Sequence, residues 1–193
     1  MTHQERKLRL KEQLRQSILD GAKSIAAKEG WHAVTIRKIA DKIQYTPPIV
    51  YEYFKSKEAL LKELVYSGFR ILGADIVEAK KSESDARHML LKLSLIHWDF
   101  AFSHRELFQL MFSLERPPPN EQMISMFKAV EDLFLSVADN DEDLSQELQL
   151  YWVSLSLGAI SIFMNTESPP PHFRRRKPRK AFEKMIQRFI SAI

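Results

Sequence analysis

The sequence predicts an all-α protein in which short N-terminal helices form a helix-turn-helix domain and longer helices form a C-terminal bundle, about nine helices in all. Apolar residues recur at steps of three and four over most of the 193 residues, which is the spacing of one helical face. Proline-rich breaks such as Pro117–Pro119 separate these segments. No alternating run of apolar and polar residues is long enough to predict a sheet.

The first helix is predicted from a stripe of apolar residues, Leu14, Ile18, Ala22 and Ile25, at steps of four, four and three. Gly30 follows this stripe. Because glycine readily adopts the left-handed conformation found at helix C-termini, we expect the first helix to end there.

Three hydroxyl residues mark the starts of the next helices. Thr35 is expected to cap a helix over residues 36–43, since its hydroxyl can accept a free backbone N–H of the first turn. Thr46 is expected to cap the following helix, in which Pro47 takes the first position, where a missing N–H costs nothing. Ser56 is expected to cap the helix after that.

Caps and apolar periodicity also place the C-terminal helices. The segment Ser103–Glu106 has the form of a capping box, in which a hydroxyl and a carboxylate each bond the other's backbone N–H. Asn120 is a further cap. These helices are expected at residues 86–102, from 103 onward, 120–138, 144–165 and 179–193.

Charge is unevenly distributed along the chain. Residues 1–70 carry a net charge of +6, residues 71–170 carry −9, and residues 171–193 carry +7, which together give the formal net charge of +4. A basic N-terminal part on an acidic body indicates a surface for a polyanion. The basic tract Arg174–Lys180 is either a second such surface or a solvated loop before the last helix.

Composition argues against catalytic and cofactor-binding classes. There is no cysteine and no glycine-rich phosphate loop. The motif Glu29–His32 is a single Glu-x-x-His, whereas a di-iron bundle needs two. We therefore expect no enzymatic activity, no cofactor and no metal site.

The sequence also indicates where the protein works. The charged segment Met1–Arg15 lacks an apolar signal core, and no stretch approaches the ~18 apolar residues of a membrane span. We therefore expect a cytoplasmic protein with no membrane partner.

Residues 35–54 read as helix, short turn, helix. In a helix-turn-helix the second helix enters the major groove of DNA and the first helix braces it. The alternative for such a segment is a purely structural corner between two helices. Lys38 and Thr46 are among the residues that can donate to phosphate, although Lys38 can equally be a solvated surface charge.

At these residues the sequence resembles a known family. Its segments Thr35–Ala40, Thr46–Phe54 and Lys55–Leu60 are similar to the N-terminal signature of the TetR/AcrR family of transcriptional regulators. The resemblance spans residues 18–62, and the helix count and length also agree with it. It implies a two-domain, all-helical homodimer that binds a DNA operator, in most members as a repressor.

The resemblance also implies roles for individual residues. The positions at which family members contact bases are Arg37, Pro47, Pro48 and Ile49, and those at which they contact the DNA backbone are Thr35, Tyr51, Tyr53 and Lys57. Gln44 departs from the family, which usually has glycine at the turn. A non-glycine residue in a left-handed turn costs roughly 1 kcal/mol.

An aromatic and methionine-rich set of residues is a candidate effector pocket, because such pockets combine apolar walls with a few polar groups. Ordinary bundle core is the alternative for each of them. The set comprises His97, Trp98, Phe100, His104, Phe108, Met111, Phe112, Met126, Phe127 and Ser154.

The last two helices carry more apolar surface than one bundle face needs, which indicates a partner interface. The family resemblance implies that these helices pair with those of a second subunit, and packing within the subunit is the alternative. The predicted interface residues are Trp152, Leu155, Ala159, Ile162, Phe182, Met185, Ile186 and Phe189.

Taken together, residues 1–55 are expected to bind DNA and residues 56–193 to regulate and dimerise. We expect a repressor that binds a palindromic operator as a homodimer and is released by a small apolar effector. The alternatives are an activator, a regulator without a ligand and, from a different class, a helical adaptor for protein interactions.

Overall fold

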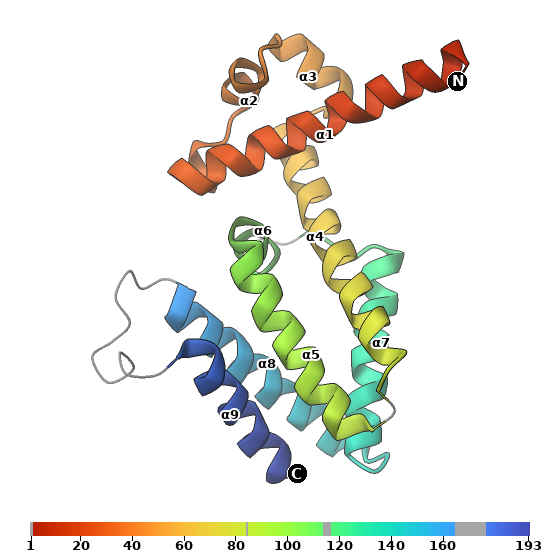
Figure 1. The fold of residues 1–193 in the computed structure, drawn as a ribbon, viewed down its shortest axis with the longest axis vertical. Helices are drawn as coiled ribbons and strands as arrows, with labels where there is room; N and C mark the ends of the chain where they lie inside the picture. Colours follow the sequence, from red (N-terminus) through yellow and green to blue (C-terminus); the bar gives the residue numbers. More distant parts are fainter. Residues whose placement is uncertain (1, 84, 114–116, 165–176) are drawn as a thin grey trace. The chain divides into compact units, whose positions relative to one another are not determined.

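The computed structural model describes residues 2–83, 85–113, 117–164 and 177–193. Over these ranges the chain forms nine α-helices and one short 3-10 turn, and it contains no strand there (Figure 1). The predicted all-α class with an N-terminal helix-turn-helix is therefore confirmed. The backbone divides into two compact units, Met1–Gly68 with Glu106–Pro117, and Phe69–Arg105 with Pro118–Ile193.

The first unit is built around α1. Its elements are α1 (His3–Glu29), the 3-10 turn Trp31–Ala33, α2 (Ile36–Ile43), α3 (Pro47–Tyr53), the first part of α4 (Lys57–Lys80) and most of α6 (Arg105–Met111). The predicted stripe on α1 is buried, with Ile18 and Ala22 fully enclosed. Gly30 ends α1 with a φ of 81°, a value that favours glycine because it has no side chain to clash.

Two of the three predicted hydroxyl caps are present. The Thr35 hydroxyl accepts the Lys38 N–H at 3.2 Å, and the Ser56 hydroxyl accepts the Ala59 N–H at 3.2 Å. Thr46 occupies the N-cap position of α3, but its side chain makes no capping bond. The prediction was wrong for this side chain because both Pro47 and Pro48 lack an N–H, and the Ile49 N–H donates instead to the backbone oxygen of Thr46 at 3.1 Å.

The second unit is a helical bundle in which α5 is central. It contains the rest of α4, α5 (Ala86–Ser103), α7 (Glu121–Val137), α8 (Glu142–Met164) and α9 (Pro178–Ser191). α5 packs against α7, α8 and α9. Within this core the Trp152 indole N–H donates to the Ser94 hydroxyl at 2.7 Å, which satisfies two polar groups that would otherwise be costly to bury.

The starts of two C-terminal helices test the predicted caps. Asn120 caps α7 as expected, since its side-chain oxygen accepts the Met123 N–H at 2.9 Å. The capping box at Ser103–Glu106 is not formed, because α5 continues through Ser103 and α6 begins at Arg105. The predicted end of α8 at residue 165 and the first three residues of the basic tract, 174–176, lie outside the described residues.

One described helix, α8, is long and apolar enough to cross a membrane by length and composition alone, with a mean hydropathy of 1.3 over its most apolar window. This finding differs from the expectation that no segment approaches a membrane span. A single helix of this kind is weak evidence for a span, because an apolar helix in a bundle meets the same criterion. Of that window, 28% is buried within the protein.

Candidate nucleic-acid interface

The helix-turn-helix consists of α2, the turn at residues 44–46, and α3, which packs against α2. Gln44 reverses the chain in the left-handed conformation, with φ 62° and ψ 39°. The turn thus keeps the backbone geometry that glycine would adopt most easily. α1 supports α2 closely at Gly21, where an added Cβ would lie 3.1 Å from Cγ2 of Ile43.

A surface depression of about 500 Å³ lies beside this motif in the first unit. Thr35 and Arg37 from α2 and its cap, Tyr51 from α3, and Lys57 from the start of α4 all line it. Four residues predicted to contact DNA are thus brought together, although they lie up to 22 positions apart in the sequence. Hydroxyl, phenol, ammonium and guanidinium groups are the donors that proteins use to hold phosphate.

The depression also contains residues that the sequence analysis did not select. Lys55 and Ser56 line it next to Lys57, at the N-terminus of the 24-residue helix α4. Unpaired N–H groups at a helix N-terminus favour an anion. Both residues belong to the signature segment Lys55–Leu60, so the signal for them was present in the sequence.

Glu58 is the acidic group of this depression. Hydrogen bonding from the Ser56 side chain and from the backbone lowers the pKa of its carboxyl group, so it stays ionised at neutral pH. The three cations of the depression, Arg37, Lys55 and Lys57, outnumber it, and the depression therefore remains a net attractor for phosphate.

Thr46, expected to contact phosphate, is exposed at the N-cap of α3, directly before three of the residues expected to reach bases. Of these three, Pro48 is exposed, and Pro47 and Ile49 are half-buried. Their accessible surface is mostly apolar, which suits contact with a thymine methyl group rather than hydrogen-bonded readout. Tyr53, at the other end of α3, is half-buried.

Lys38 does not line the depression. Its ammonium group is 2.7 Å from the Glu29 carboxylate. The hydrogen bond and the charge of Lys38 lower the pKa of Glu29, so this carboxyl group stays ionised at neutral pH. The ammonium group thus already has a carboxylate partner on α1, and its contact with phosphate stays a prediction.

The comparison with known proteins agrees with this geometry. Residues 18–64, from α1 to the first turns of α4, match the family model of bacterial regulatory proteins of the tetR family. The N-terminal part of the chain thus carries the DNA-binding domain of the TetR family. The chain is accordingly a DNA-binding regulator of transcription, as predicted.

Individual proteins resemble this TetR-family regulator over most of its length. It is 20% identical to the HTH-type transcriptional activator FasR of Mycolicibacterium smegmatis over 166 residues, which cover 82% of this chain and 76% of that protein. A protein of unknown function from Rhodococcus sp. RHA1 has the same fold, with a TM-score of 0.75, 21% identity and coverage of 93% of this chain and 95% of the other.

A TetR variant from Acinetobacter baumannii, solved in complex with minocycline, also shares the fold. Its TM-score is 0.68 at 16% identity, and the match covers 91% of this chain and 93% of that one. At such low identity these structures establish the fold of the regulator and nothing finer.

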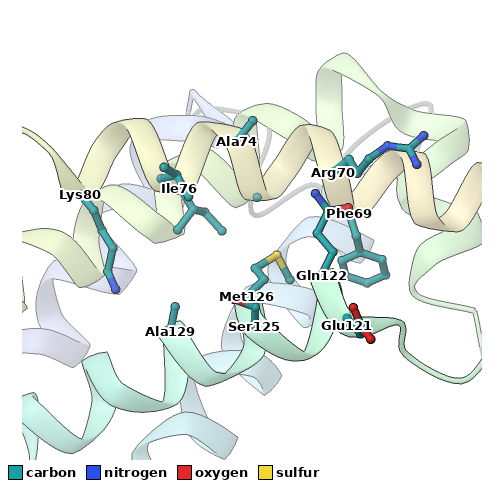
Figure 2. Close-up of a pocket in the computed structure, with 12 residues that line it drawn as sticks. Phe69, Arg70, Ala74, Ile76, Lys80, Glu121, Gln122, Ser125, Met126 and Ala129 are labelled. Atoms are coloured by element: carbon teal, nitrogen blue, oxygen red, sulfur yellow. The ribbon is translucent and has the colours of Figure 1, made fainter.

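A groove of about 590 Å³ lies between α4 and α7 in the second unit (Figure 2). Figure 2 shows Ile76 and Lys80 reaching from α4 toward α7, and Met126 reaching from α7 toward α4. Of the predicted pocket residues, Met126 lines this groove. The α4 wall of this groove was not predicted from the sequence.

The other predicted pocket residues are not brought together by a described cavity. His97, Trp98 and Phe100 are buried in the core of the second unit, and Phe102 stacks on Trp98 with ring centroids 4.5 Å apart. These large rings fill the bundle interior by packing on one another. The remaining residues are distributed as follows: Phe108, Met111 and Phe112 in the first unit, His104 beside Phe100, Phe127 against Phe69, and Ser154 on α8.

Burial divides the predicted dimer interface into two groups. Trp152, Phe182 and Ile186 are 7%, 1% and 0% exposed, so they form the core of their own unit and have no surface left for a second subunit. The prediction was wrong for these three residues. The other five, Leu155, Ala159, Ile162, Met185 and Phe189, line an open groove of about 690 Å³ between α8 and α9.

Proposed function

We propose that this TetR-family regulator binds a pseudo-palindromic operator as a homodimer and represses transcription in the cytoplasm. The observation that carries the proposal is the single depression that collects Thr35, Arg37, Tyr51 and Lys57 beside α3. In such an interface phosphate contacts fix the register of the protein and base contacts specify the sequence. Residues 1–55, with Ser56 and Lys57 at the start of α4, bind DNA, and the following residues up to 193 regulate and dimerise.

The proposed response is release by a small apolar effector. An effector that binds better to dimers with the wrong spacing of recognition helices lowers DNA affinity by shifting populations. The groove between α4 and α7 supports this proposal, with apolar walls that include Ile76 and Met126. The minocycline complex of a distantly similar TetR variant is consistent with a small-molecule ligand.

Activation is the second candidate, because the similar FasR is named as a transcriptional activator. The proposal includes no catalytic step. Within the described ranges no group of three or more His, Cys, Asp or Glu side chains could hold a metal ion.

The test begins with selection of bound sites from a random duplex pool, which supplies both a specific probe and the half-site spacing. Lys57→Gln is then expected to weaken binding to the selected duplex and to random duplex alike. It should also reduce the slope of log affinity against log salt by about 0.9, the value for one lost phosphate contact.

Lys62→Gln is the matched control, since Lys62 is an exposed lysine of the same helix that does not line the depression. Its affinity and salt slope should equal those of the wild type. Equal slopes for the Lys57 variant and the wild type would remove the depression from the DNA interface. A selection that recovers unpaired half-sites would contradict the homodimer.

A further inference from the structure

The N-terminal part of α1 stands apart from the core of the first unit. Every side chain from His3 to Gln13 is exposed, and burial begins only with Leu14 and becomes complete at Ile18. In Figure 1 this end of α1 projects beyond α3. We call residues 3–13 the arm. At 1.5 Å per residue it is about 15 Å long.

The arm is held in helical form without tertiary packing. Its N-terminus has a capping box, in which the Thr2 N–H donates to the Glu5 carboxylate at 2.8 Å and the Glu5 N–H donates to the Thr2 hydroxyl at 3.2 Å. A capped extension of an anchored helix avoids the nucleation cost that makes short isolated helices unstable. The arm is therefore helical before any partner binds, and its side chains keep the spacing of a helix.

The arm borders the turn of the helix-turn-helix. Leu10 and Gln13 of the arm, together with Leu14 and Ser17, form a groove of about 350 Å³ with Ile43 and Tyr45. Tyr45 immediately precedes Thr46, the N-cap of α3. Because the N-terminal end of a recognition helix is the end that faces the bases, the arm lies next to the base-reading end of α3.

Positive charge on the arm lies on the groove face and along its two borders. Arg6 precedes Leu10 by four residues and lies on the groove face, whereas Lys7 and Arg9, two residues apart, flank that face on its two sides. Among the described residues, none of the three forms an ion pair with a carboxylate.

The carboxylates of this segment, Glu5 and Glu12, have partners away from the groove. Glu5 belongs to the capping box. Glu12 lies 3.8 Å from Arg15, whose guanidinium also pairs with Glu63 of α4 at 3.1 Å. The contacts of Arg15 thus lie toward α4 and not toward the groove. The groove face of the arm is consequently cationic.

We propose that Arg6, Lys7 and Arg9 bind phosphate groups of the DNA that flanks the half-site read by α3. The inference rests on the proposed function, since it extends the same interface outward along the duplex. Each cation adds a contact that depends on salt but not on base sequence. The arm thus lengthens the DNA segment that one subunit protects.

The experiment compares two duplexes, one limited to the selected operator and one extended by about ten base pairs, one helical turn, on each side. The arm variant carries Arg6→Gln, Lys7→Gln and Arg9→Gln. The matched control carries Lys128→Gln, Lys177→Gln and Lys180→Gln, which removes three exposed cations from the second unit. Affinity is measured between about 50 and 200 mM salt.

On the extended duplex the arm variant should lose about 2–3 units of salt slope, which corresponds to roughly 0.9 per phosphate contact. On the short duplex it should bind like the wild type, and the control variant should match the wild type on both. The charge-conserving pair Arg6→Lys and Arg9→Lys should retain the wild-type slope, and circular dichroism verifies that each variant keeps its helix content.

An unchanged slope for the arm variant on the extended duplex overturns the inference while leaving the proposed function standing. Equal losses on both duplexes also overturn it, because the flanks would then not be what the arm contacts. A wild-type protein that binds neither duplex overturns the proposed function itself, and the arm proposal with it.

Discussion

At the scale of single residues, variants of Arg37 distinguish contact with DNA bases from contact with the DNA backbone. It is exposed and shares its depression with Tyr51 and Lys57, while the family resemblance assigns it to base contacts. Arg37→Ala should relax discrimination at one base pair per half-site by roughly 1–3 kcal/mol, the range for one bidentate arginine contact.

Competition binding against duplexes with single base changes measures this effect. Arg37→Lys is the informative companion, because it keeps the charge and loses the planar fork. Uniform weakening with all base preferences intact would assign Arg37 to the phosphates instead.

His97 is a buried residue whose protonation couples to folding. It is 6% exposed and lies against Trp152, with ring centroids 5.8 Å apart. Burial lowers the pKa of His97 to about 4, from a usual value of 6.5. Between these two values the unfolded chain binds a proton that the folded chain does not, so stability falls as the pH is lowered through this window.

The free energy of unfolding should therefore lose about 2 kcal/mol from this residue between pH 7 and pH 5. Urea unfolding at both pH values measures the loss, and His97→Leu provides the reference because it cannot titrate. The same pH dependence in the wild type and in the variant would exclude His97 as its source.

At the scale of secondary-structure elements, the turn between α2 and α3 carries strain that glycine would relieve. Gln44 has a φ of 62°, a conformation that costs a residue with a side chain roughly 1 kcal/mol. Gln44→Gly should raise the free energy of unfolding by about 0.5 kcal/mol, since the greater freedom of glycine in the unfolded chain offsets part of the gain.

Gln44→Val should lower the stability by more than about 1 kcal/mol, because a β-branched side chain tolerates a left-handed backbone poorly. Chemical denaturation of the wild type and the two Gln44 variants measures the order of their stabilities. A glycine variant less stable than the wild type would show that the Gln44 side chain contributes contacts that outweigh the strain.

Helix boundaries were largely predictable because they depend on local chemistry. Gly30, Thr35, Ser56 and Asn120 each end or begin a helix as expected. Two predicted caps failed for reasons that are also local. α5 continues through Ser103, and two consecutive prolines after Thr46 leave α3 without the N–H groups of its first two positions.

At the scale of the whole molecule, the homodimer proposal depends on the open groove between α8 and α9. Ile162 is 43% exposed and lines this groove together with Leu155 and Phe189. A lysine placed in an apolar interface must be desolvated without a partner. Ile162→Lys should therefore convert a dimer of two 22.6 kDa chains into monomers.

Analytical ultracentrifugation measures the mass, and the variant should also lose cooperative binding to the two half-sites. Leu150→Lys is the control. Leu150 is 64% exposed on the same helix but does not line the groove, so this variant should remain dimeric. If both variants remain dimeric, the interface lies outside the groove between α8 and α9.

The sequence by itself determined the helices and the identity of the DNA-binding motif. Apolar spacing, caps and turns act between residues a few positions apart, so they can be read along the chain. The resemblance of short signature segments to the TetR/AcrR family selected Thr35, Arg37, Tyr51 and Lys57.

Only the tertiary structure decided which of these residues share a surface. Packing of α1 on α2 brings the Glu29 carboxylate to the Lys38 ammonium group, an ion pair that no local pattern indicated. Packing of α5, α8 and α9 encloses Trp152, Phe182 and Ile186, while α4 and α7 form a groove that no local pattern indicated. Whether an apolar or charged side chain faces a neighbour or solvent depends on contacts between distant segments, which periodicity cannot specify.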